Sequence, residues 1–126
     1  MSNKRLVAVV DDDQRVLESL ADLLESAGHS VLVFESAHAL LQTGRLSDIH
    51  CLIADIGMPM VDGFELRRLA RAARPELPVI LITGRHEMAD QQRHLEQGND
   101  AFFHKPFDGR EMLEAVANAL RDQRGR

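Results

Sequence analysis

The sequence has no tryptophan and no tyrosine, and it has a single cysteine. One cysteine cannot form a disulfide within the chain, which excludes the class of small secreted domains held together by disulfides. We therefore expect a reducing, cytoplasmic location, with Cys51 as a small buried residue at the start of a strand. No apolar run approaches the roughly 20 residues of a membrane-spanning helix, and we expect neither a signal peptide nor a membrane partner.

Positive charge is also scarce. Fifteen Lys and Arg residues face twenty Asp and Glu residues, for a net charge of −5, which argues against direct nucleic-acid binding by this domain. Arg67, Arg71 and Arg74 recur at helical spacing, and we expect them to form a solvated helix face. None of the six histidines has the spacing of a zinc site.

The 126 residues are 44% hydrophobic and 28% charged, as expected for one soluble globular domain. We place its core at about 5–121, followed by a polar tail at 122–126. Five apolar segments rich in branched or aromatic residues are typical of strands: 5–10, 29–34, 50–55, 77–83 and 100–104. Amphipathic helical patterns alternate with them. This alternation predicts an α/β fold with a doubly wound, flavodoxin-like, five-stranded parallel sheet of order 2-1-3-4-5, with five helices on its two faces.

The expected helices have recognisable ends. Gly28 suits the end of the first helix, and four polar residues can cap helix starts: Asp13, Ser36, Asp62 (with Glu65) and Asp108 (with Glu111). We expect the last helix to bury Leu113, Val116, Ala117 and Leu120. The segment 86–97 has a thin apolar stripe, which fits either an ordinary surface helix or a loosely held helix that can move.

Polar residues follow the central strands of this sheet. In strand order they are Asp11, Asp12 and Asp13, then Asp55, then Thr83, and finally Lys105. The carboxyl ends of parallel strands meet at one edge, so we expect these side chains to converge there. Carboxylates at this density need a cation, and an all-oxygen set suits Mg²⁺ together with a phosphoryl group. A carboxylate beside the metal can act as a nucleophile and form an acyl phosphate.

Lysine usage supports this interpretation. Of the fifteen basic residues only Lys4 and Lys105 are lysines, so the ammonium at the end of the fifth strand stands out in a chain that otherwise uses arginine. We expect Lys105 to neutralise the oxygens of the transferred phosphoryl group, with Thr83 as a hydrogen-bond donor to one of them.

Four blocks carry a family resemblance: VVDDDQ, LIADIGMPMVDGFEL, VILITG and AFFHKPF. In order and spacing they resemble the receiver domains of two-component response regulators. The resemblance implies that Asp55 accepts a phosphoryl group from a sensor histidine kinase or a phosphotransfer protein. It also implies that Asp12 binds Mg²⁺ (or Mn²⁺) directly and Asp11 mainly through water, with the Gly57 carbonyl as a further ligand. Lys105 would pair with the phosphoryl group.

The resemblance also implies a switch. Thr83 would follow the phosphoryl group, and Phe102 would move with it, while Phe103 faces the other side of the sheet. The surface formed by 86–97, 100–104 and the last helix would then control an effector domain, a partner protein or a phosphorylation-dependent homodimer. Asp13 would cap the first helix, and the Lys105–Pro106 bond would be cis.

Three positions depart from the family pattern: Gly57, Val61 and Arg85. Gly57 and Arg85 would flank the path of an attacking water. We expect Arg85 chiefly to set the lifetime of the phosphoryl group, and an unchanged dephosphorylation rate in Arg85→Ala would refute this.

Two other functions fit parts of the sequence. Asp11, Asp12 and Asp13 after a strand also fit the D-x-D start of Mg²⁺-dependent phosphatases of the haloacid dehalogenase type, which use an aspartate nucleophile, but Asp55 and its MP…DG sequel would then be unexplained. A receiver-like binding module that works without phosphorylation would normally lack one of the acids or the lysine. We therefore expect no enzyme beyond self-catalysed phosphotransfer and autodephosphorylation. Whether the tail at 122–126 ends a stand-alone regulator or leads to an effector stays open.

Overall fold

The computed structural model describes residues 5–84 and 101–124. Its centre is a five-stranded sheet in the order β2-β1-β3-β4-β5 with all neighbouring strands parallel, which confirms the predicted topology. The strands are β1 (Leu6–Val10), β2 (Ser30–Phe34), β3 (Cys51–Asp55), β4 (Val79–Thr83) and β5 (Ala101–His104).

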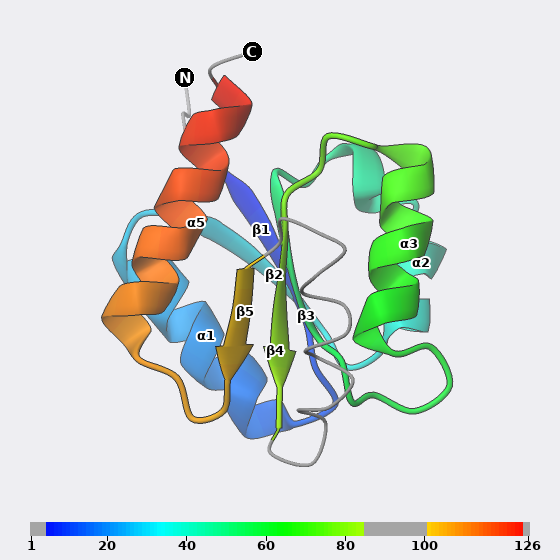
Figure 1. Ribbon diagram of the computed structural model, residues 1–126, viewed down its shortest axis with the longest axis horizontal. Helices are drawn as coiled ribbons and strands as arrows, with labels where there is room; N and C mark the ends of the chain where they lie inside the picture. Colours follow the sequence, from blue (N-terminus) through cyan, green and yellow to red (C-terminus); the bar gives the residue numbers. More distant parts are fainter. Residues whose placement is uncertain (1–4, 85–100, 125–126) are drawn as a thin grey trace.

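Helices cover both faces of the sheet. They are α1 (Gln14–Ser26), α2 (Ala37–Thr43), α3 (Gly63–Ala73) and α5 (Gly109–Arg124), with a short 3-10 helix at Arg45–Ser47. Helices α1 and α5 lie on one face, and α2 and α3 on the other (Figure 1). The described residues therefore contain four α-helices, and the expected helix at 86–97 lies outside them. Among the described residues, none of the helices combines the length and the apolar character that a membrane crossing requires.

The predicted N-caps act as the sequence indicates, whereas the Glu65 carboxylate accepts from Arg68 and does not complete a capping box within the described residues. The side chain of Asp13 accepts a hydrogen bond from the Arg15 N–H at 3.0 Å, and Ser36 and Asp62 cap α2 and α3 in the same way. Asp108 accepts from two N–H groups of the first turn of α5. These bonds satisfy backbone donors that have no partner within the helix, so each helix start is fixed relative to the strand before it.

The core lies in two layers, one on each side of the sheet. Every residue of β3 and β4 is buried, because both strands are central and covered on both faces. Cys51 at the start of β3 is buried as predicted, and burial raises the pKa of its thiol to about 12. The thiol is therefore protonated and unreactive at neutral pH.

The buried stripe of α5 differs from the prediction. Met112, Val116 and Leu120 are buried, whereas Leu113 is only half-buried and Ala117 is exposed. The actual stripe has a spacing of four residues, which rotates the buried face by about one residue from the predicted one. The long, flexible side chain of Met112 starts this stripe and packs against the layer of α1.

The arginines of α3 do not form a solvated face. The Arg67 guanidinium lies 5.6 Å from the centroid of the Phe64 ring, and Arg71 Nε donates to the Leu77 carbonyl at 3.2 Å. Arg74 Nη1 donates to the Leu46 carbonyl at 2.8 Å and also to the Ile49 carbonyl. The expectation was wrong because Arg71 and Arg74 donate to backbone carbonyls in the segments before β4 and β3, while Arg67 packs over the Phe64 ring.

We expect Arg74→Lys to lower the free energy of unfolding by about 1–3 kcal/mol, since an ammonium cannot reach both carbonyls with the geometry of a guanidinium. Arg68→Lys in α3, the helix that Arg74 follows, is the matched control, because Arg68 pairs with Glu65 in solvent. Urea unfolding of both variants measures the difference. Equal losses of stability in both variants would contradict this role of Arg74.

Candidate functional site

Three charged side chains from separate parts of the chain meet at the carboxyl edge of the sheet. Asp11 follows β1, Asp55 ends β3, and Lys105 follows β5. Lys105 Nζ lies 3.1 Å from Asp11 Oδ2 and 3.5 Å from Asp55 Oδ1. The convergence expected from the strand order is therefore present, with one ammonium bridging two buried carboxylates.

Backbone pairing continues just past the strands and fixes these positions. The Asp11 N–H donates to the Phe34 carbonyl at 3.1 Å, and the Lys105 N–H donates to the Thr83 carbonyl at 2.9 Å. Side chains at this edge are thus held by the sheet itself rather than by long loops. Such positioning on rigid elements is what a reacting carboxylate requires.

Burial dominates the electrostatics of the two carboxylates. Burial raises the pKa of Asp55 to about 6, and the nearby negative charge of Asp11 adds to this, although Lys105 opposes it. Burial likewise raises the pKa of Asp11, against the backbone N–H of Asp13 and the ammonium of Lys105. Burial lowers the pKa of Lys105, but the two carboxylates outweigh it, so this pKa stands above its ordinary value. The site holds more negative charge than its lysine can balance.

Asp11, Asp12 and Asp55 each offer a carboxylate oxygen, and the three oxygens lie within 4.8 Å of one another. Asp11 Oδ2 is buried, and its contact among the described residues is the Lys105 ammonium at 3.1 Å. An exposed carboxylate (Asp12) beside two buried ones leaves one side of the group accessible. Three anionic oxygen donors, whose charge a single ammonium does not balance, fit a hard divalent cation such as Mg²⁺.

Three other predicted site residues lie around this cluster or beyond the described part. Thr83 is buried, and its hydroxyl donates to the Gly84 carbonyl at 3.1 Å. The backbone N–H of Gly57 is near the Asp55 carboxylate and partly opposes the rise in the pKa of that group. Arg85 lies outside the described residues.

The two phenylalanines of β5 point to opposite faces of the sheet, as the alternation of a strand predicts. Phe102 packs against Phe64 of α3 with ring centroids 6.1 Å apart. Phe103 packs against Phe107 on the face of α1 and α5, with centroids 6.3 Å apart. Phe102 therefore links the strand next to Thr83 with helix α3.

Sequence reasoning missed Gly63, the first residue of α3. A Cβ atom at this position would lie 2.6 Å from the Asp55 carbonyl oxygen and 2.8 Å from the Ile56 Cα. The helix therefore approaches the backbone of Asp55 so closely that only glycine fits. The sequence does not separate Gly63 from Gly109, which also begins a helix after an aspartate but has only the Leu23 side chain nearby.

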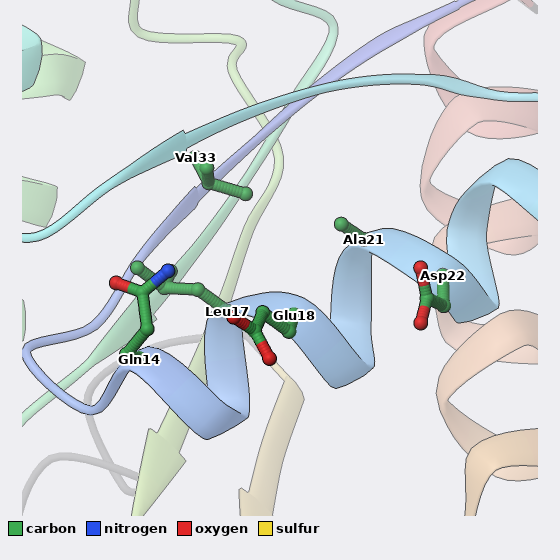
Figure 2. A pocket seen from close by; sticks show the side chains of 6 residues that line it. All are labelled: Gln14, Leu17, Glu18, Ala21, Asp22 and Val33. Atoms are coloured by element: carbon green, nitrogen blue, oxygen red, sulfur yellow. The ribbon is translucent and has the colours of Figure 1, made fainter.

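A groove of about 300 Å³ lies between α1 and β2 (Figure 2). It is lined by Gln14, Leu17, Glu18, Ala21, Asp22 and Val33. None of these residues belongs to the acidic cluster. Among the described residues, the acidic cluster thus lies at the carboxyl edge of the sheet and not in this groove.

The family model of the response regulator receiver domain matches residues 7–117. The chain belongs to this family. The match includes residues of all five strands and the acidic cluster. It therefore favours a receiver domain over a phosphatase of the haloacid dehalogenase type. Receiver domains are in general not classical enzymes. The Lys105–Pro106 peptide bond is cis, as the resemblance implied.

Two curated relatives are transcriptional regulators. The transcriptional regulatory protein CreB of Escherichia coli (strain K12) is 36% identical over 118 residues, which are 94% of this chain and 52% of the relative. The transcriptional regulatory protein FixJ of Azorhizobium caulinodans is 38% identical over 114 residues, which are 90% of this chain and 54% of the relative. The receiver chain thus spans about half the length of these relatives.

Solved structures agree with the fold. The crystal structure of a CheY-like response regulator receiver domain protein from Methanospirillum hungatei JF-1 superimposes with a TM-score of 0.85 at 28% identity, and the match covers 98% of each chain. The receiver fold is therefore shared over nearly the full chain, including the segments that carry the acidic edge.

Proposed function

We propose that Asp55 of this receiver domain accepts a phosphoryl group from a histidine kinase or a phosphotransfer protein. The observation that carries the proposal is the Asp55 carboxylate, which is only 5% exposed and lies 3.5 Å from Lys105 beside two further aspartates. A structural carboxylate would not gain from this crowding, because its charge is desolvated and repelled. In contrast, a carboxylate that acts as the nucleophile toward an anionic, metal-bound group does gain from this crowding.

In this reaction an Asp55 oxygen attacks phosphorus in line. The new P–O bond forms as the P–N bond to the donor histidine breaks, and the bonding electron pair leaves with the imidazole. Lys105 stays within reach of the acceptor oxygen and neutralises the charge of the phosphoryl oxygens. Mg²⁺ or Mn²⁺, held by Asp11, Asp12, Asp55 and the Gly57 carbonyl, would supply further charge neutralisation. Asp55 is a stronger nucleophile than an exposed aspartate because its carboxylate is poorly hydrated.

The readout that we propose starts at Thr83, whose buried hydroxyl would move from the Gly84 carbonyl to a phosphoryl oxygen. Phe102 lies one strand away on β5 and would follow into the vacated space. This would change the surface of β5 and α5 together with the segment 86–97. An effector domain, a partner protein or a second copy of the chain would read that surface.

The organisation of the whole protein is part of this proposal. Residues 1–126 form one receiver domain with a core at about 5–121, located in the cytoplasm. Because the chain spans about half the length of its transcriptional relatives, an effector domain in the complete protein is a natural extension.

The test is the intact mass of the protein after incubation with phosphoramidate and Mg²⁺. We expect one added phosphoryl group, which is lost with EDTA and in Asp55→Asn, because the acceptor and the cation are both required. Asp48→Asn, an exposed aspartate away from the cluster, is the matched control and should be modified like the wild type. An adduct that persists in Asp55→Asn would refute Asp55 as the acceptor. If wild type shows neither an adduct nor beryllofluoride binding, the module without phosphorylation becomes the better description.

A further inference from the structure

Asp13 is the third acid of the run after β1, but it is not part of the metal cluster, which consists of Asp11, Asp12 and Asp55. Its backbone N–H donates to Asp11 Oδ1 at 2.9 Å, so the residue lies directly against a cluster carboxylate. Its side chain caps α1 through the Arg15 N–H. An uncharged serine or asparagine caps a helix about as well, so the charge itself adds only a modest interaction with the helix dipole.

The charge of Asp13 is poorly compensated within the described residues. The three cluster carboxylates carry three negative charges, which a divalent cation and the Lys105 ammonium balance. Asp13 adds one more negative charge, and Arg15 Nε is 3.7 Å from its carboxylate. Both side chains of this pair are exposed, at 91% for Arg15 and 40% for Asp13, so the pair is weak and screened by water.

We propose that Asp13 makes the site selective among phosphodonors by repelling small anionic ones. This inference rests on the proposed phosphorylation of Asp55. A free phosphodonor such as acetyl phosphate is a dianion, and at Asp55 it lies near the partly exposed Asp13 carboxylate, because Asp13 is hydrogen-bonded directly to the cluster residue Asp11. A protein donor meets the same repulsion but offsets it with contacts over a large interface. Asp13 therefore lowers phosphorylation by small metabolites more than phosphorylation by a cognate protein.

The expected magnitude is modest. One charge acting through water on a dianion several ångströms away changes the rate about two- to fivefold. At about 0.1 M ionic strength the Debye length is about 10 Å, and at about 1 M it is about 3 Å, so the effect should fade as salt is added.

The experiment compares phosphorylation rates of the wild type and Asp13→Asn with acetyl phosphate at saturating Mg²⁺. We expect Asp13→Asn to react about two- to fivefold faster at about 0.1 M ionic strength, with the gain lost at about 1 M. Phosphoramidate carries less negative charge at neutral pH, so the gain should be smaller with it. Arg15→Gln should have the opposite effect, because it removes the partial compensation of Asp13.

Glu25→Gln at the far end of α1 removes the same charge from the same helix and is the matched control, expected to react like the wild type. Unfolding of Asp13→Asn checks that the cap is retained. An Asp13→Asn rate equal to the wild type, or a gain that does not respond to salt, overturns the role of Asp13. Failure of the wild type both to become phosphorylated and to bind beryllofluoride would instead overturn the proposed function.

Discussion

Gly63→Ala is expected to destabilise the domain by about 2–4 kcal/mol and to slow phosphorylation about 10- to 100-fold. The added Cβ would lie 2.6 Å from the Asp55 carbonyl oxygen, a separation that requires either α3 or the end of β3 to move. The obstacle is backbone and cannot rotate away as a side chain could. The better helix propensity of alanine, about 1 kcal/mol, does not offset this.

Gly109→Ala is the matched control for this experiment. Gly109 is also the first residue of a helix after an aspartate cap, but a Cβ there would meet only the flexible Leu23 side chain, at 3.3 Å. Urea unfolding and the phosphorylation rate should therefore change little in Gly109→Ala. If Gly63→Ala matched the wild type in both measurements, the close approach of α3 to Asp55 would not matter.

Asp55→Asn is expected to stabilise the metal-free protein by about 3 kcal/mol at pH 7. In the wild type the folded pKa of Asp55 is about 6, above the ordinary value of 3.8, because burial and Asp11 disfavour the ionised form. Between these values the folded state keeps a proton that the unfolded state has lost. The free energy of unfolding therefore falls as pH rises from about 4 to about 6, and the full penalty is present above pH 6.

Urea unfolding in EDTA across pH 4 to 8 measures this penalty as the difference between the wild type and Asp55→Asn. The difference should be largest at neutral pH and close to zero near pH 4. The comparison of two variants is needed because burial lowers the pKa of His50 and of His29, so their contribution is lost as pH falls below about 6.5. Leu6 N–H donates to His50 Nδ1 at 2.9 Å, which requires the neutral imidazole.

Added Mg²⁺ should reverse the order of stability at pH 7, because it stabilises the wild type and has little affinity for Asp55→Asn. Equal stability of the two proteins at every pH would mean that the Asp55 carboxylate is not desolvated as its burial indicates.

Much of this molecule could be predicted from the sequence. Apolar runs of strand length alternating with amphipathic segments require a parallel sheet, and one strand order then brings Asp11, Asp55 and Lys105 to a single edge. Caps such as Asp13 are local, because a side chain and the N–H groups two or three residues later always lie within reach. The opposite facing of Phe102 and Phe103 follows from strand alternation alone.

Other features depended on contacts between distant segments. The Arg67, Arg71 and Arg74 stripe looks solvated in the sequence, because the carbonyls that Arg74 binds lie 25 and 28 residues away. The buried stripe of α5 includes Met112 and excludes Ala117 because the rotation of a helix is set by what it packs against.

The sequence by itself determined which residues stand at the carboxyl ends of the strands, since chain order and periodicity decide that. Only the tertiary structure decided how strongly these side chains are desolvated and how closely other segments approach them. Desolvation of Asp55 depends on how completely other elements cover it, and the fit of Gly63 depends on the distance between α3 and the end of β3. Both are through-space quantities, set by packing between segments that the sequence does not place side by side.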